Sequence, residues 1–135
     1  MALTRCRIGL VGAGRAAAGH ASTLARFHDV SIVGVNDPDL DAAARLAERT
    51  GSTVAPTLEA LLGLRPHAVY VCVPPYAHGP IEDEVLNAEL PMFIETPLGV
   101  DRDVPDALAR RVASTGVVTA VGHHWRHSAA VLRAQ

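Results

Sequence analysis

The residues best placed to do chemistry are three small ones in a short run after an apolar stretch. Gly12-Ala13-Gly14-Arg15-Ala16-Ala17 fits the pattern G-x-G-x-x-G/A, with alanine in the third small position. In such a turn the first glycine permits a tight bend, and the second lets the backbone approach a pyrophosphate. The third small residue keeps the following helix close to the strand. The N–H groups at the start of that helix would then face the anion.

A carboxylate further along the chain complements this turn. Asp37 directly follows the apolar run Val30–Asn36, where a carboxylate can accept hydrogen bonds from the hydroxyls of an adenosine ribose. Asp37 also fits a helix N-cap or a turn residue that binds no ligand. The two roles are compatible, because Asp39 can cap the next helix instead. A negative charge at this place would repel the 2′-phosphate of NADP, and no arginine follows before Arg45. The two features predict a nicotinamide dinucleotide as cofactor and favour NAD over NADP.

Short apolar runs alternate with stretches rich in Ala, Leu, Glu and Arg, which is the pattern of strands alternating with helices. Near-continuous apolar strands favour a parallel sheet that is covered on both faces. The sequence therefore predicts an α/β fold with a doubly wound, mostly parallel six-stranded sheet, the Rossmann arrangement. The expected strands are Arg5–Val11, Val30–Asn36, Ser52–Ala55, Ala68–Val73, Pro91–Glu95 and Val117–Val121. The expected helices are Arg15–His28, Leu40–Arg49, Leu58–Leu62, Ile81–Ala88 and Val104–Ala113.

Size and composition narrow the class of protein. At 135 residues, with 49% hydrophobic and 19% charged residues, the chain suits one packed domain. A formal net charge of −2 gives no basic surface for a polyanion, so we expect no nucleic-acid partner. No apolar run approaches the roughly 20 residues that span a bilayer, so we expect no membrane partner and a cytoplasmic location. Cys6 and Cys72 are expected to be buried free thiols.

Several motifs, taken together, resemble the Gfo/Idh/MocA family of glucose–fructose oxidoreductase, inositol dehydrogenase and rhizopine-catabolism proteins. The resemblance rests on the order of the glycine turn continued to His20, then Asp37, Val73-Pro74-Pro75-Tyr76-Ala77-His78, Glu95-Thr96-Pro97-Leu98 and Gly122-His123-His124-Trp125-Arg126. It implies an NAD(P)-dependent oxidoreductase that moves hydride between nicotinamide and an alcohol of a sugar or cyclitol. It also implies a second, substrate-binding domain that is absent here. Residues 1–122 are then the dinucleotide-binding domain and residues 123–135 the start of a linker or crossover.

The resemblance also implies a set of cofactor-binding residues. They are Gly12, Ala13, Gly14, Arg15, Ala16, Ala17, Asp37, Val73, Pro74, Pro75, His78, Glu95, Thr96 and Pro97. The family motif reads Glu-Lys-Pro, and its lysine is taken to help transfer the hydroxyl proton, but this chain has Thr96 there and no lysine anywhere. An aliphatic hydroxyl has no pKa near neutrality, so Thr96 is a poor general acid or base. The candidate catalytic residues are Glu95, Thr96 and His78.

Three functions stay open on the sequence. The chain is the NAD-binding half of an oxidoreductase, a non-catalytic NAD-binding or regulatory module, or a different nucleotide site such as that of an S-adenosylmethionine-dependent transferase. The group His123, His124 and His127 lacks the spacing of a metal site, so no metal is expected. Trp125 and Arg126 would leave apolar surface exposed, which predicts a homo-oligomer or a partner chain unless the tail folds back over it.

Overall fold

One parallel sheet organises the computed structural model, which describes residues 5–134; residues 1–4 and 135 lie outside the described part. Its strands are β1 (Cys6–Val11), β2 (Val30–Asn36), β3 (Thr53–Val54), β4 (Ala68–Val71), β5 (Met92–Ile94) and β6 (Thr119–Val121). They are all parallel and lie in the order β3-β2-β1-β4-β5-β6. The order reverses between β1 and β4, so the loops after these two strands diverge there. The predicted doubly wound Rossmann sheet is confirmed.

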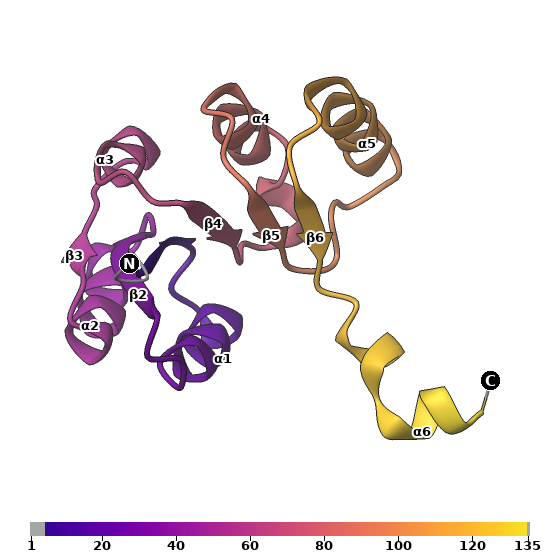
Figure 1. Ribbon diagram of the computed structural model, residues 1–135. Coiled ribbons are helices and arrows are strands. Elements are labelled where there is room, and N and C mark those ends of the chain that lie inside the picture. The colour runs from indigo at the N-terminus through magenta and orange to yellow at the C-terminus, as the bar shows by residue number, and fades with distance from the viewer. Residues whose placement is uncertain (1–4, 135) are drawn as a thin grey trace.

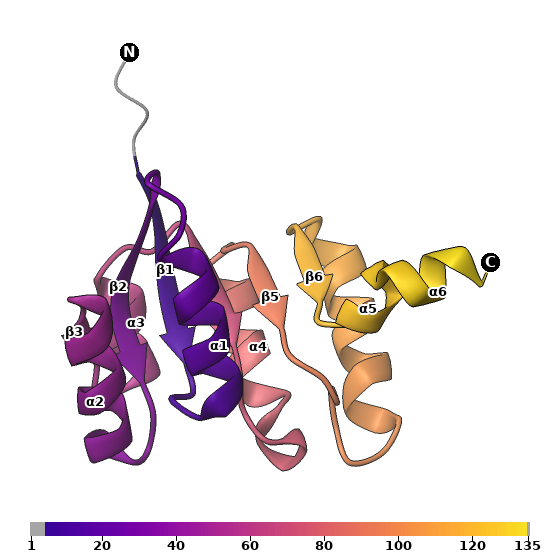
Figure 2. The same ribbon diagram turned by 90° about the horizontal axis from the view of Figure 1, so that it is seen from below.

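Helices cover both faces of the sheet, as parallel strands with right-handed crossovers require. The helices α1 (Arg15–Leu24) and α2 (Leu40–Thr50) lie on one face, and α3 (Leu58–Gly63), α4 (Pro80–Asn87) and α5 (Asp103–Thr115) lie on the other (Figures 1 and 2). Single turns of 3-10 helix, η1 and η2, span Pro75–Ala77 and His124–His127. After η2 the chain forms the short helix α6 (Ala129–Arg133), which projects away from the sheet (Figure 1).

The apolar core is divided by the sheet into two clusters. The cluster under α3, α4 and α5 contains Leu61, Val85 and Leu108, and the cluster under α1 and α2 contains Ala17 and Leu46. Along β4 the side chains alternate between the two, because successive residues of a strand point to opposite faces. Val69 and Val71 are fully buried on the α4 side, whereas Tyr70 packs on the α1 side.

A notch without side chains lets α3 approach the sheet closely. Gly9 of β1 and Gly34 of β2 are register partners, and both face Leu61 of α3. A Cβ atom on Gly9 would lie 3.3 Å from the Leu61 side chain, and one on Gly34 would lie 2.7 Å from it. Leu61 is fully buried in this notch. The two glycines therefore set how close the crossover from β3 to β4 packs against the first two strands.

Helix α1 ends earlier than predicted, and strand β4 is shorter than predicted. Helix α1 stops at Leu24 instead of His28, because the carbonyl of Asp29 already accepts a hydrogen bond of 2.7 Å from the Cys6 amide at the start of β1. Strand β4 ends at Val71 instead of Val73, because two prolines without N–H groups follow shortly. The predicted linker from residue 123 contains η2 and α6, and the predicted domain boundary there stays a prediction.

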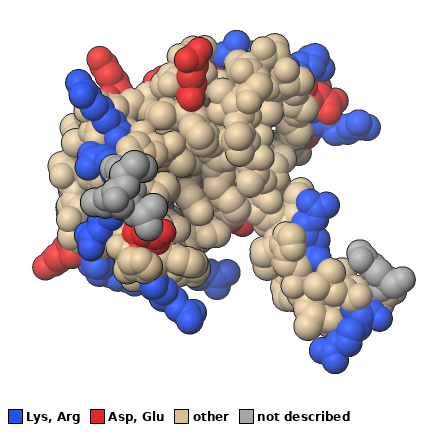
Figure 3. All heavy atoms as spheres, in the orientation of Figure 1, with Lys and Arg blue, Asp and Glu red and all other residues tan. Residues whose placement is uncertain are grey.

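Charged side chains are dispersed over the face of the molecule seen in Figure 3, with a broad uncharged area between them. The projecting arm of η2 and α6 differs, because it carries Arg126 and Arg133 and no acidic residue. Within residues 5–134 no helix has the length and apolar character needed to cross a membrane.

Truncation of the notch residue should destabilise the fold. We expect Leu61→Ala to lower the free energy of unfolding by about 2–5 kcal/mol, because it leaves a cavity between α3 and the two glycines. Urea denaturation followed by circular dichroism measures the change. Leu40→Ala is the control, because Leu40 is 51% exposed and its truncation leaves no cavity. Equal losses in the two variants would contradict the close packing of α3.

Candidate functional site

The glycine turn after β1 has the backbone that its small residues predict. Gly12 has a φ of +93°, a left-handed conformation that favours glycine, and a Cβ atom there would overlap the carbonyl oxygen of Cys72. At Gly14, the residue before α1, a Cβ atom would meet nothing within 4 Å. Ala17 is fully buried in the cluster between α1 and the sheet. The turn is therefore tight at its base and open at the start of the helix.

Asp37 joins the end of β2 to this turn. Its Oδ2 accepts a hydrogen bond of 2.7 Å from the Ala13 amide, and its Oδ1 accepts one of 2.8 Å from the Asp39 amide. Asp39 caps α2 by accepting from the amides of Asp41 and Ala42, as the sequence suggested. Each oxygen of a carboxylate can accept a second hydrogen bond, so the half-buried Asp37 keeps acceptor capacity for a ligand.

A cleft of about 620 Å³ opens beside the turn, between the ends of β1, β2 and β4. Among the expected cofactor residues it brings together Gly12, Gly14, Arg15, Ala16, Asp37, Val73 and Pro74. It also gathers residues that sequence reasoning missed, among them Asn36, Cys72, Tyr76, Ala77 and Ile81. The signal for Tyr76 and Ala77 was their place directly after the paired prolines, in the turn that follows β4, whereas Ile81 lies in the first turn of α4.

The Cys72 thiol in the cleft wall is a poor nucleophile. Burial first, and the nearby negative charge of Glu95 second, raise the pKa of Cys72 to about 12. The thiol therefore stays protonated at physiological pH. Both cysteines are free, as expected, although Cys6 is half-buried and not fully buried.

The expected residues at the end of β5 lie outside the lining of this cleft. Glu95 and Thr96 are half-buried there, and the peptide bond between Thr96 and Pro97 is cis. Glu95 faces a second hollow of about 440 Å³ on the α1 side of the sheet, which we call the lateral hollow. Its walls include His20, Phe93, Glu95, Gly122 and His124, and it shares Arg15 and Ala16 with the cleft. The first turn of α1 thus separates the two spaces.

His78 lies behind the turn after β4 and does not line either space. Its Nδ1 lies 2.5 Å from Oε1 of Glu82, and both side chains are fully buried. An ionised carboxylate accepts but does not donate, so Nδ1 is the donor of this bond when Glu82 is ionised. Oε2 of Glu82 accepts a hydrogen bond of 2.6 Å from the Gly79 amide, so the same carboxylate caps the start of α4. Within residues 5–134 the Nε2 atom of His78 has no hydrogen-bond partner.

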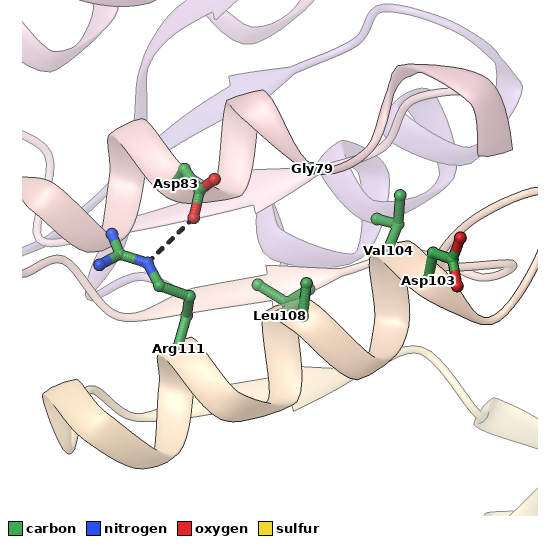
Figure 4. Close-up of a pocket in the computed structure, with 7 residues that line it drawn as sticks. Gly79, Asp83, Asp103, Val104, Leu108 and Arg111 are labelled. Atoms are coloured by element: carbon green, nitrogen blue, oxygen red, sulfur yellow. Dashed lines mark hydrogen bonds and ion pairs between the residues drawn. The ribbon is translucent and has the colours of Figure 1, made fainter.

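A further hollow, of about 260 Å³, lies between α4 and α5 on the outer side of the molecule (Figure 4). Leu108 and Val104 form its apolar floor, and an ion pair of 3.1 Å between Arg111 and Asp83 closes one end. Both partners of this pair are exposed, which limits its strength in water. None of the expected cofactor residues lines it.

Comparison with known proteins supplies the family. Residues 6–123 match the family described as "Oxidoreductase family, NAD-binding Rossmann fold", which is Gfo/Idh/MocA. The chain belongs to this family. The resemblance based on the glycine turn and the later motifs is confirmed, and the chain is an NAD-binding domain of that oxidoreductase family.

Relatives of this Gfo/Idh/MocA domain are longer proteins. It is 28% identical to a UDP-N-acetylglucosamine 3-dehydrogenase of Acidithiobacillus ferrooxidans and 30% identical to an inositol 2-dehydrogenase of Rhizobium meliloti. The two alignments cover 87% and 89% of this chain but 36% of each relative. The crystal structure of GenD2 from gentamicin A biosynthesis, in complex with NAD, superimposes with a TM-score of 0.89 at 30% identity, covering 96% of this chain and 38% of that one. The chain therefore spans little more than a third of these relatives.

The buried pair behind the cleft should be important for stability. We expect His78→Ala to lower the free energy of unfolding by about 3 kcal/mol, because it removes a hydrogen-bond donor from a carboxylate that has no access to water. Asp83→Ala, which removes an exposed ion pair on α4, the helix that carries Glu82, should change the free energy of unfolding by less than about 1 kcal/mol. Urea unfolding of both variants measures the difference. A loss in His78→Ala no larger than that in Asp83→Ala would contradict a stabilising role for the pair.

Proposed function

We propose that the chain binds NAD in the cleft beside the glycine turn, as the cofactor half of a dehydrogenase. The observation that carries the proposal is the bond between the Ala13 amide and the Asp37 carboxylate, which places an open helix start and a ribose acceptor on one cleft. The proposed contacts include Gly12, Gly14 and Asp37 from this side of the cleft. Val73, Pro74 and Pro75 contribute from the other side.

The open space at Gly14 suits an anion. A Cβ atom at this position would project into space that is empty of protein atoms within 4 Å, directly before the first turn of α1. Amide groups at a helix start point outward and carry partial positive charge, so they attract a pyrophosphate. Arg15, the first residue of the helix, adds a full positive charge beside it. The bound dinucleotide would have its adenosine half on the β2 side and its nicotinamide half toward β4 and β5.

The preference for NAD over NADP rests on the charge at the end of β2. A 2′-phosphate on the adenosine ribose would lie beside the carboxylate of Asp37, with Asp39 two residues away. Among the described residues that line the cleft, the one basic residue is Arg15, which belongs to the start of α1 and not to the end of β2. We therefore propose NAD as the physiological cofactor.

The proposed reaction is hydride transfer between the nicotinamide and a secondary alcohol of a sugar or cyclitol. Nicotinamide supplies the hydride acceptor when it is bound. Glu95 and Thr96 are the proposed residues at that end, with Pro97 completing the turn. His78, the third candidate, is fully buried against Glu82, so we assign it no contact with the reacting groups. Substrate contacts would come from the part of the relatives that has no counterpart in this chain, either in a longer protein or in a partner.

A partner is further supported by apolar side chains on the projecting arm. Trp125 is 71% exposed and Leu132 is 57% exposed. Large apolar side chains that are grouped on an extended arm are costly to leave in water. We propose that a second polypeptide surface, from another chain or from a homo-oligomer, covers this arm.

A second candidate function is a non-catalytic NAD-binding or regulatory module. Thr96 favours it, because the residue stands where the family motif has lysine and its hydroxyl cannot serve as a base near neutral pH. The complete absence of lysine from the chain means that no neighbouring amine can substitute.

Calorimetry of the purified chain tests cofactor binding. We expect NADH to bind, NADPH to bind about tenfold more weakly, and S-adenosylmethionine to give no signal. Gly14→Val should weaken NADH binding by more than about tenfold, because the new side chain occupies the space proposed for the pyrophosphate. Gly63→Val, where the surroundings are equally open but distant from the cleft, is the matched control. Binding of S-adenosylmethionine without NADH, or an unchanged affinity in Gly14→Val, would reject the proposal.

An activity screen tests whether the chain catalyses hydride transfer by itself. We expect no NADH formation when the chain is incubated with NAD and a panel of polyols and sugars. Thr96→Lys should remain inactive, because a proton-transfer group alone does not supply a substrate pocket. The absorbance of NADH measures turnover. Robust turnover by the unmodified chain would overturn the non-catalytic alternative and this expectation together.

A further inference from the structure

His20 on α1 and Glu95 at the end of β5 form a pair that joins two distant motifs. The Nε2 atom of His20 lies 2.8 Å from Oε2 of Glu95. An ionised carboxylate only accepts hydrogen bonds, so Nε2 is the donor of this bond when Glu95 is ionised. The His20 side chain is 29% exposed and the Glu95 side chain 17%, so water competes only partly for the bond. The pair therefore ties the helix that follows the glycine turn to the strand end that precedes Thr96.

Aromatic rings hold the histidine in this orientation. The His20 ring packs edge-on against Phe93, with ring centres 4.9 Å apart, and against Tyr70, with centres 5.5 Å apart. Tyr70 and Phe93 are neighbours on β4 and β5 and stack on each other at 4.8 Å. Edge-to-face contacts of this kind favour one ring direction. The aromatic contacts and the bond to Glu95 therefore favour the same orientation of the His20 ring.

The carboxylate of Glu95 occupies space that a glycine leaves at the end of β6. A Cβ atom on Gly122 would lie 2.8 Å from Oε2 of Glu95. The backbone is held as well, because the Glu95 amide donates to the Val71 carbonyl at 2.8 Å and the Gly122 amide donates to the Ile94 carbonyl at 2.9 Å. Main chain and side chain of Glu95 are thus both fixed, and with them the start of the turn that carries Thr96.

We propose that His20 is a positioning residue for the nicotinamide end of the site, acting through Glu95. This inference rests on the proposed NAD cofactor and deepens it. Arg15 and Ala16 of the same helix line both the cleft and the lateral hollow, so the helix that faces the pyrophosphate also holds the end of β5. Loss of the tie would release Glu95 and the following turn, and leave the adenosine side, which depends on Asp37, as it is.

A role in general packing would give a different result from a positioning role. A helix that is displaced as a whole would weaken the binding of every ligand that touches its first turn. A positioning role at the end of β5 affects only the half of the dinucleotide that lies there. ADP-ribose contains the adenosine, the pyrophosphate and a second ribose but lacks nicotinamide, so comparison of its binding with that of NADH separates the two roles.

The test is calorimetry of NADH and ADP-ribose with His20→Ala, His20→Gln, Glu95→Gln and the double variant His20→Ala/Glu95→Gln. We expect NADH binding to weaken about tenfold in His20→Ala, with ADP-ribose binding unchanged. His20→Gln, which keeps a side-chain N–H donor, should recover part of the loss. The double variant should bind NADH no more weakly than Glu95→Gln alone, because His20 acts through Glu95. His28→Ala is the control, because His28 is exposed in the loop at the other end of α1.

Each outcome decides the question. Unchanged NADH binding in His20→Ala overturns the inference and leaves the proposed function intact. Equal weakening of NADH and ADP-ribose also overturns it, because it indicates a general packing role. Additive losses in the double variant show that His20 does not act through Glu95 and overturn it as well. If the unmodified chain binds neither ligand, the proposed function fails and the inference fails with it.

Discussion

The hydrogen bond from the Ala13 amide to the Asp37 carboxylate is the interaction on which the site depends. A tight glycine turn leaves outward-facing amides that need acceptors, and this carboxylate satisfies one of them at 2.7 Å. The bond is possible because β1 and β2 are parallel neighbours in a register that pairs Val11 with Asn36, the residues just before the turn and the acid. The register of two strands thus aligns the helix start with the acid.

The topology then builds two spaces around one helix. The strand order reverses between β1 and β4, so the cleft opens between the loops that follow these strands. On the adjoining face of the sheet, His20 of α1 packs against Tyr70 of β4 and Phe93 of β5. Arg15 and Ala16 stand at the division between the two. One short helical turn therefore borders both the surface that suits a pyrophosphate and the strand end that carries Glu95.

Local backbone requirements made much of the fold predictable from the sequence. Gly12 was predictable because its conformation excludes other residues, and Asp37 because a strand end beside a glycine turn needs an acceptor. The bond between His20 and Glu95 was not, because nothing local in the sequence signals a contact between the first helix and the fifth strand. The burial of His78 was also hidden, since its partner Glu82 has the sequence signature of an ordinary surface residue near a helix start. The end of α1 was misjudged because tertiary hydrogen bonding at Asp29 overrode helix propensity.

The state of Cys72 has a consequence for the durability of the cleft. The thiolate form of cysteine is the nucleophile that reacts with peroxides, disulfides and alkylating agents, and a thiol with a pKa of about 12 offers almost none of it at neutral pH. Cys72 nevertheless belongs to the cleft wall, and its backbone carbonyl lies close to Gly12. Oxidation would turn this buried thiol into a polar, larger group within the wall of the cleft. The same burial and charge that suppress ionisation thus shield the glycine turn from oxidative damage.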